Sequence, residues 1–294
     1  MSVKKSRLTW IAAFLLTACT YKLDPYKPDE RSAPKTKDDY HLVWNDEFNT
    51  EGSPNKSVWQ FEHGFVRNEE LQWYSEANAT CENGVLLIKA LKQTISNDQY
   101  DSSSSDWRKN RPFAAYTSAS INTAKSHAWL YGSFEIRARI DTAKGSWPAI
   151  WTLGTNGEWP KNGEIDLMEF YRVNNEPSVL ANVAWGTDRQ YTAKWNTHIS
   201  PLSRFTKQDS NWVKKFHTWR MDWTADSIKL YLDTTLMNTM ALSKTINADG
   251  SNPFTNPQYL LLNLAIGGNG GDPAKTEMPI KYEVDYVRVY QKNK

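Results

Sequence analysis

The feature that most constrains the fold is a recurrence of short strand-like segments, without any long stretch of helical periodicity. Residues 133–140, 227–232 and 282–290 alternate apolar and polar side chains, and residues 84–90 form a mainly apolar run. Alternation places the apolar side chains on one face of a strand, and turn residues separate the segments. A chain with this pattern is expected to form an all-β sandwich of two stacked antiparallel sheets.

Length and charge fit one exported domain of this class. A single β-sandwich domain can reach the length of this chain, 294 residues. The formal charge of +2 includes Lys4, Lys5 and Arg7, and without them 32 basic residues face 33 acidic ones. This near-neutral balance argues against nucleic acid as a partner, because nucleic-acid binding needs a basic surface.

The first residues predict export and lipid attachment. Three basic residues precede the apolar run 8–16, which is too short to span a bilayer, so residues 1–18 are interpreted as a signal peptide. The sequence Leu-Thr-Ala-Cys ending at Cys19 resembles a bacterial lipobox, in which the cysteine is lipidated. Residues 19–39, rich in Lys, Asp and Pro, form the expected tether, and residues 40–294 the catalytic domain. We therefore expect a lipoprotein of a bacterial membrane, the outer one.

Cysteine usage supports this organisation. If Cys19 carries lipid, Cys81 has no partner for a disulfide bond within the chain. A buried and inert thiol is then the expected state of Cys81.

Three acids stand in the segment Gly-Glu-Ile-Asp-Leu-Met-Glu that ends at Glu169. In a regular strand, Glu164 and Asp166 share one face and Glu169 points to the other. One extra residue at Leu167 or Met168 would form a β-bulge and return Glu169 to the face of Glu164, and bulges are common beside active sites. We predict two glutamates on one surface with an aspartate between them. The alternative is a solvated strand face, since charged side chains on strands usually contact water.

Paired carboxyl groups on one surface are what retaining glycoside hydrolysis requires. One carboxylate attacks the anomeric carbon while a second carboxylic acid protonates the leaving oxygen, with about 5 to 5.5 Å between the two groups. Asp166 would hydrogen-bond to the nucleophile, and its negative charge would help to keep the acid protonated near neutral pH.

Tryptophans surround these acids. Trp147, Trp151 and Trp159 precede them, and Trp185 follows them. An indole offers apolar area to the C–H face of a pyranose ring and one N–H donor to its hydroxyls. The chain holds 14 Trp and 14 Tyr, so several belong to the core, but a cluster beside paired acids favours sugar binding.

The segment that ends at Glu169 resembles the bulged catalytic signature of glycoside hydrolase family 16, the family of laminarinases and lichenases. The resemblance extends over nearly the whole mature chain and includes residues 42–48, 68–74, 116–119, 145–151 and 259–291. It implies a β-jelly roll with a concave face that carries the cleft. It also implies a retaining endo-glycosidase that requires no cofactor and acts as a monomer on a polysaccharide.

The resemblance assigns individual roles. It implies that Glu164 is the nucleophile, Glu169 the acid/base and Asp166 their helper. Trp159 matches a tryptophan that stacks on the sugar next to the scissile bond. Asn68 lies in a segment that matches a loop at the non-reducing side of the cleft.

A calcium ion is a further expectation from the resemblance, because family members often hold one on the convex face. The ligands would be Glu47, the backbone carbonyl of Gly84 and Asp285, which supply the oxygen atoms that calcium prefers. The alternative is that both carboxylates pair with surface cations.

One position departs from the family pattern. Many laminarinases carry a histidine before a tryptophan on the strand after the catalytic one, whereas this chain has Ala184 and Trp185. The favoured substrate is a β-1,3- or mixed β-1,3-1,4-glucan. The alternative is an endo-β-1,4-galactosidase acting on poly-N-acetyllactosamine, keratan or mucin O-glycans. A non-catalytic glycan-binding lipoprotein is less favoured, because a pure binder has no need of paired acids.

Other segments indicate little further chemistry. The five histidines lack the spacing of a zinc site, and no Gly-x-Ser-x-Gly motif occurs. The glycine-rich residues 267–271 predict a turn near the cleft, and residues 97–112 predict a polar loop. If that loop borders the cleft, Trp107 and Arg108 would help to select substrates.

Overall fold

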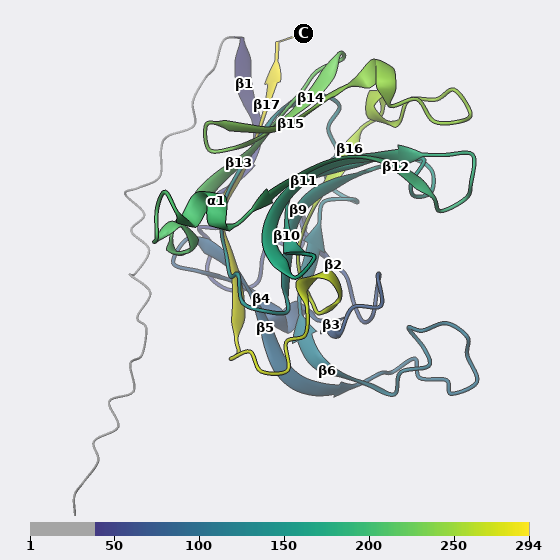
Figure 1. The fold of residues 1–294 in the computed structure, drawn as a ribbon, viewed down its shortest axis with the longest axis vertical. Coiled ribbons are helices and arrows are strands. Elements are labelled where there is room, and N and C mark those ends of the chain that lie inside the picture. The colour runs from purple at the N-terminus through teal and green to yellow at the C-terminus, as the bar shows by residue number, and fades with distance from the viewer. Residues whose placement is uncertain (1–38, 294) are drawn as a thin grey trace, which may run out of the picture.

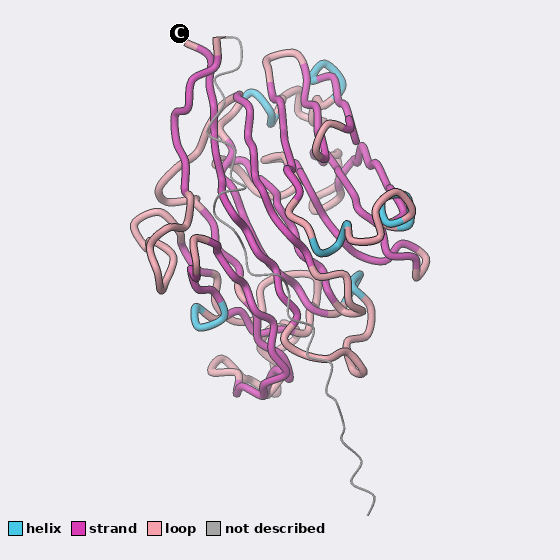
Figure 2. The backbone as a smooth tube through the Cα atoms, turned by 90° about the vertical axis from the view of Figure 1, so that its left-hand side faces the viewer, coloured by secondary structure: helices cyan, strands magenta, loops and turns pink. Residues whose placement is uncertain are grey.

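The computed structural model describes residues 39–293, which form two β-sheets with only short helices between strands (Figures 1 and 2). One sheet has the order β15 (Thr235–Ala241), β14 (Ser227–Leu232), β13 (His217–Trp223), β8 (Gly132–Ile140), β17 (Ile280–Lys292), β5 (Val85–Ser96), β6 (Phe113–Ser118) and β3 (Gln72–Tyr74), with β1 (Tyr40–Asp46) paired to β17 and β4 (Ala79–Glu82) paired to β5. The other has the order β12 (Ala193–Pro201), β11 (Glu176–Gly186), β10 (Glu164–Val173), β9 (Ser146–Gly154), β16 (Gln258–Ile266), β7 (Ser120–Asn122) and β2 (Gln60–Phe61). The short helices are η2 (Glu76–Asn78), α1 (Ser203–Thr206), η3 (Trp212–Lys214), η4 (Leu242–Lys244), η5 (Pro253–Thr255) and η6 (Gly268–Gly270).

This architecture is the predicted jelly-roll sandwich. The four strand-like segments of the sequence become parts of β5, β8, β14 and β17. Neighbouring strands run antiparallel, except that β3 and β6 pair in parallel. The seven-stranded sheet is strongly curved, and its concave side opens away from the ten-stranded sheet (Figure 1).

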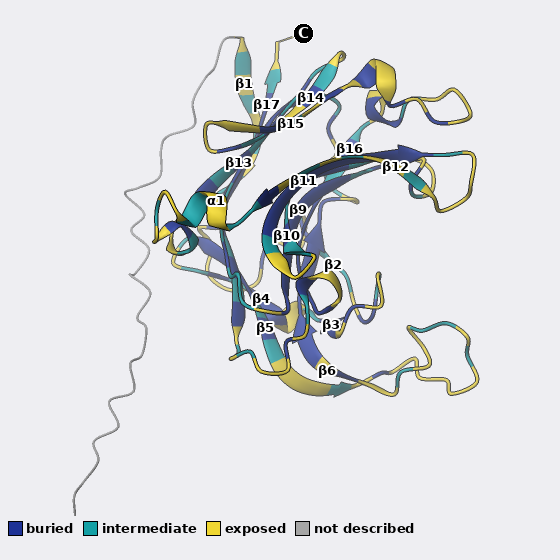
Figure 3. Ribbon diagram, viewed as in Figure 1, coloured by how far each residue is buried: buried dark blue, intermediate teal, exposed yellow. Residues whose placement is uncertain are grey.

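The core lies between the two sheets and is built from alternate residues of their strands. Strand β10 contributes Ile165 and Phe170, while β8 and β13 contribute Phe134 and Trp219, all with at most 1% of their surface exposed. Figure 3 shows the inner strands as buried and most connecting loops as exposed. Burial of each such side chain contributes about 1.5–3 kcal/mol, so the strands that carry the acids are rigidly held.

A β-bulge interrupts β10 where the sequence predicted one. Asp166 pairs with Trp151 and Asn182, and the register then shifts against both neighbouring strands before Glu169 pairs with Ala149 and Leu180. Two consecutive residues, Leu167 and Met168, both point into the core. The two-residue alternation therefore restarts at Glu169, which returns to the same face as the other two acids.

The carboxylates expected to bind calcium are each bound by an arginine. Arg288 donates from Nε and Nη2 to the two oxygens of Glu47 at 2.8 and 2.9 Å, and Arg137 Nη1 lies 2.6 Å from Asp285 Oδ2. No group of three His, Cys, Asp or Glu side chains suited to a metal occurs among residues 39–293. Both carboxylates thus have a cationic partner, and the calcium ion expected at Glu47, Gly84 and Asp285 stays a prediction.

Cysteine 81 is a free, buried thiol, as predicted. Burial, with smaller contributions from Asp46 and Glu51, raises the pKa of the Cys81 thiol to about 12. The thiol therefore stays protonated and unreactive at neutral pH. Cys19, with the predicted signal peptide and most of the predicted tether, lies outside the described residues.

The polar loop of residues 97–112 supports a neighbouring loop. Asn97 Nδ2 donates to the carbonyls of Arg108 and Arg111, both at 2.8 Å, and so holds the loop closed on itself. Arg111 in turn donates to the carbonyls of Glu69 and Glu70 at 3.1 and 2.8 Å. Trp107 packs against the small cluster around Phe65. The loop thus fixes the residue 65–70 segment.

Because Ile165 forms core between the acids Glu164 and Asp166, we expect Ile165→Ala to lower the free energy of unfolding by about 2–5 kcal/mol. Urea denaturation measures this change. Ile246→Ala is the matched control, since Ile246 is 41% exposed and its truncation should change stability by less than about 0.5 kcal/mol. Equal losses in the two variants would contradict the assignment of Ile165 to the core.

Candidate active site

A cleft of about 510 Å³ lies on the concave face of the seven-stranded sheet. Strands β9 to β12 and β16 form its floor, and the segment after β2 forms one wall. The residues that line it are Arg67, Asn68, Glu70, Trp147, Ala149, Trp151, Leu153, Trp159, Glu164, Asp166, Glu169, Tyr171, Asn182, Trp195, Thr197, Asn263 and Asn269. The three predicted acids and four of the predicted tryptophan and asparagine contacts are thus gathered in one place.

Strand register arranges the floor in rows across the sheet. Glu164 lies between Leu153 on β9 and Ala184 on β11, so the row that contains it is otherwise apolar. Asp166 lies between Trp151 and Asn182 in the next row. Directly paired residues of antiparallel strands point to the same face, which is why these side chains converge on the cleft.

Both glutamates are held by indole N–H groups. Trp159 Nε1 donates to Glu164 Oε2 at 2.5 Å, and Trp147 Nε1 donates to Glu169 Oε1 at 2.9 Å. Asn182 Nδ2 donates to the second oxygen of Glu169 at 2.9 Å. Each carboxyl group is therefore fixed in orientation before any ligand arrives.

Burial makes Glu169 a proton carrier near neutral pH. Removal from water is the main cause that raises the pKa of Glu169 to about 7, and the charges of Glu164 and Glu70 add to it. The hydrogen bonds from Trp147 and Asn182 act in the opposite sense, because they favour the ionised form. A carboxyl group with a pKa of about 7 can both donate and accept a proton under physiological conditions.

The aspartate between the glutamates is driven toward its neutral form. Burial, followed by the charges of Glu164 and Glu169, raises the pKa of Asp166 well above its usual value. Burial also raises the pKa of Glu164, but a hydrogen bond from Asp166, the Trp159 donor and the charge of Arg67 all oppose that rise. A protonated Asp166 that donates to an ionised Glu164 is therefore the favoured arrangement, which differs from the negatively charged Asp166 expected from the sequence.

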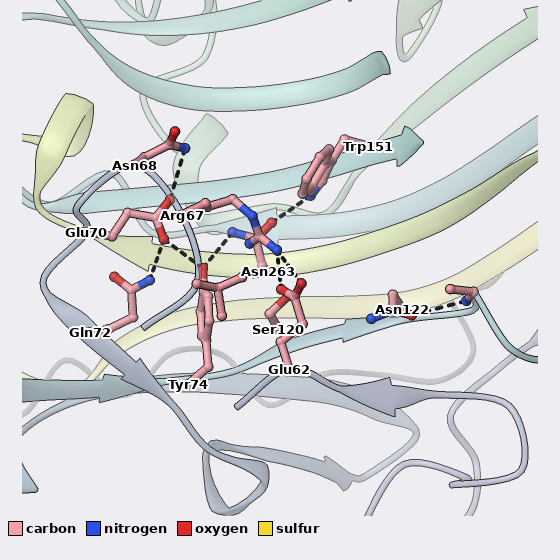
Figure 4. A network of polar contacts seen from close by, with 12 residues as sticks. Glu62, Arg67, Asn68, Glu70, Gln72, Tyr74, Ser120, Asn122, Trp151 and Asn263 are labelled. Carbon is pink, nitrogen blue, oxygen red and sulfur yellow. Dashed lines mark hydrogen bonds and ion pairs between the residues drawn. The ribbon is translucent and has the colours of Figure 1, made fainter. Parts of the chain in front are cut away.

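A polar network forms the wall of the cleft beyond Trp151 (Figure 4). Buried Glu70 accepts hydrogen bonds from Asn68, Gln72 and Tyr74 at 3.2, 2.6 and 3.3 Å. Asn263 extends this hydrogen-bond network to Trp151, because its Nδ2 donates to Tyr74 Oη and its Oδ1 accepts from Trp151 Nε1 at 2.7 Å. The network fixes the plane of the Trp151 ring.

Arg67 joins this wall to the cleft. Its guanidinium pairs with Glu62 and lies over the Trp151 ring at 5.1 Å from the ring centroid. Its Nη1 atom is buried and has no hydrogen-bond partner within the described part of the chain. The Arg67 side chain is one of those that line the cleft.

One predicted contact is wrong. Trp185 belongs to the core between the sheets, on the opposite face of β11 from Ala184 and Asn182. Successive strand residues alternate faces, and only one of Ala184 and Trp185 can face the cleft. Ala184 is the residue on the cleft side of β11, and it pairs directly with Glu164 on the catalytic strand.

Several cleft residues were not predicted from the sequence: Arg67, Glu70, Tyr171, Asn182, Trp195, Thr197, Asn263 and Asn269. Asn182 lies two residues before Ala184 on the same face, so the register of β11 would have identified it. Tyr171 lies two residues after Glu169 on β10, so the alternation that restarts after the bulge would have identified it as well. The remaining residues come from other segments of the chain, and no local pattern marks them.

Comparison with known proteins agrees with this geometry. The model of glycosyl hydrolases family 16 matches residues 67–288. A beta-glucanase of Rhodothermus marinus is 34% identical over 86% of this chain and 85% of its own length.

Two solved structures share the fold. One comes from work on endo-acting O-glycanases with which members of the human gut microbiota initiate mucin breakdown; it is 35% identical, has a TM-score of 0.80 and covers 89% of this chain and 94% of its own. The other is a LamA variant from Zobellia galactanivorans in complex with laminaritriose and laminaritetraose, 32% identical with a TM-score of 0.67 over 85% of this chain and 98% of its own.

We expect Trp147→Phe to raise the pKa of Glu169 further above 7, because it removes a donor that favours the carboxylate. Carbon-detected NMR titration of glutamate-labelled protein measures the shift. Trp151→Phe is the matched control, since the Trp151 N–H is donated to Asn263 rather than to Glu169. A Glu169 pKa that stays constant or falls in Trp147→Phe would contradict the role given to this hydrogen bond.

Proposed function

The chain belongs to glycosyl hydrolase family 16, and from this premise we propose that it is a retaining endo-glycosidase whose preferred substrate is a β-1,3- or mixed β-1,3-1,4-glucan. The observation that carries the proposal is the bulge in β10, which brings Glu164 and Glu169 into one cleft. Each of these carboxyl groups accepts a hydrogen bond from a different tryptophan N–H. The likeness to the Rhodothermus beta-glucanase and to LamA with bound laminari-oligosaccharides supports a glucan.

In the proposed mechanism, Glu164 is the nucleophile. Its carboxylate attacks the anomeric carbon, while Trp159 N–H and protonated Asp166 hold it in orientation. Glu169 gives its proton to the leaving oxygen as the glycosidic bond breaks, which yields a covalent glycosyl-enzyme.

The second step reverses the role of Glu169. Now ionised, Glu169 takes a proton from water, and the resulting attack on the anomeric carbon frees Glu164 and retains the configuration. A pKa of about 7 suits both halves of the cycle, since the group must lose and regain one proton per turnover.

The cleft contains the features that a β-linked glycan needs. Trp151 and Trp159 present aromatic surface to the apolar faces of pyranose rings. Arg67 and Asn68 lie on the same wall, and both side chains carry N–H donors suited to sugar hydroxyls. We assign this wall to the glycone.

A second candidate is an endo-β-1,4-galactosidase on poly-N-acetyllactosamine, keratan or mucin O-glycans. Two observations favour it: the TM-score of 0.80 with the structure from the O-glycanase work, and Ala184 opposite Glu164 in place of a polar side chain. In this candidate Glu164 and Glu169 keep the same roles.

Substrate choice is tested by kcat/KM on laminarin, mixed-linkage glucan, keratan sulfate and mucin O-glycans, with Glu164→Gln as the inactive control. We expect cleavage of both glucans, because an apolar position such as Ala184 discriminates by only about 1–3 kcal/mol per sugar group. Cleavage of the galactose-containing polymers alone would replace the glucanase proposal by the second candidate.

We further propose that the protein is exported and lipid-anchored through Cys19 to a bacterial outer membrane. The basic residues, the short apolar run and the lipobox-like sequence support this proposal. Among residues 39–293, none of the helices has the length and apolar character needed to cross a bilayer.

We expect Cys19→Ser to move the protein from the membrane fraction to the soluble fraction, since the acyl attachment point is removed. Fractionation with immunoblotting measures the distribution, and Cys81→Ser is the control because Cys81 is buried within the domain. A wild-type protein found unmodified in the soluble fraction would exclude the anchor.

A further inference from the structure

The edge strand β12 exposes an unusual side chain to the cleft. Trp195 is 47% exposed and lines the cleft together with Thr197. Edge strands are usually protected by charged side chains, and a large exposed aromatic residue there leaves apolar surface in water. Trp195 makes no hydrogen bond through its indole N–H within the described residues. An exposed indole at this position in the cleft is suited to contact a bound ligand.

Strand register aligns Trp195 with the active-site glutamate. Glu164 pairs with Ala184, and Ala184 pairs with Trp195. These three residues form one row on the concave face, because direct partners on antiparallel strands share a face. Two strand spacings separate β12 from β10, so Trp195 is about 10 Å from the strand of Glu164.

Between them, Ala184 contributes only a methyl group. It is fully buried and adds no polar group to the row between Glu164 and Trp195. Thr197 adds a hydroxyl group in the neighbouring row, opposite Asn182.

We propose that Trp195 is an aromatic platform for a hexopyranose unit of the substrate, beyond the sugar that reacts at Glu164. This outer sugar site lies at the end of the cleft opposite Asn68, since β12 and β2 are the two edges of the sheet. The C–H face of a β-linked sugar stacks on the indole, and Thr197 meets the hydroxyl groups at its rim. The proposal rests on the proposed function, because it extends the same cleft.

The test compares substrates of increasing chain length. In Trp195→Ala, kcat/KM on the polysaccharide should fall about three- to ten-fold, the range expected for loss of one aromatic stacking contact. The loss should be smaller on the shortest oligosaccharide that the wild type cleaves, since that substrate does not reach β12. Trp195→Phe should restore most of the loss, because it keeps an aromatic face.

Phe113→Ala is the matched control, since Phe113 is an exposed aromatic residue, 55% accessible, that does not line the cleft. It should match the wild type at every chain length. An equal loss in Trp195→Ala at all lengths, or no loss on the polymer, would overturn the proposal.

Binding without turnover gives a second readout. In a Glu164→Gln background, addition of Trp195→Ala should weaken the affinity for the soluble polymer about three- to ten-fold, measured by affinity electrophoresis. Unchanged affinity would overturn the outer sugar site. If the wild type cleaves only a galactose-containing polymer, the glucan proposal fails while the same comparisons on that polymer still decide the role of Trp195.

Discussion

The packing of Leu167 and Met168 into the core is the constraint on which the active site depends. Two consecutive core-facing residues break the alternation of β10 and turn Glu169 back to the cleft. Without that change of phase, Glu169 would point between the sheets and only Glu164 and Asp166 would face the cleft. The apolar interior of the sandwich thus determines which carboxyl groups meet substrate.

Three acids on one strand face repel one another, and their different surroundings give them different pKa values and therefore different roles. Mutual repulsion and burial drive Asp166 to its neutral form, and burial brings the pKa of Glu169 to about 7. Burial raises the pKa of Glu164 too, but Trp159, the hydrogen bond from Asp166 and the charge of Arg67 oppose that rise and favour its carboxylate. One proton is then available for transfer, and one carboxylate is available for attack.

The sequence pattern predicted the sheet class and the bulge because both follow from local alternation of apolar and polar residues. Alternation does not reveal which of two neighbouring residues faces the core, so Trp185 was placed in the cleft although it packs inside. A local sequence pattern also cannot predict contacts between distant segments, such as the ion pair of Arg288 with Glu47. Trp195 was missed because only its register with Ala184 places it beside the acids.

The central claim is that the bulge sets Glu164 to attack while Glu169 transfers protons. Incubation with a 2-deoxy-2-fluoro glycoside bearing a good leaving group traps the glycosyl-enzyme, because the fluorine slows its hydrolysis more than its formation. Peptide mapping by mass spectrometry then locates the sugar. The account predicts one label per chain, on Glu164. A label on Glu169, or full turnover with no covalent intermediate and an inverted product, would contradict it.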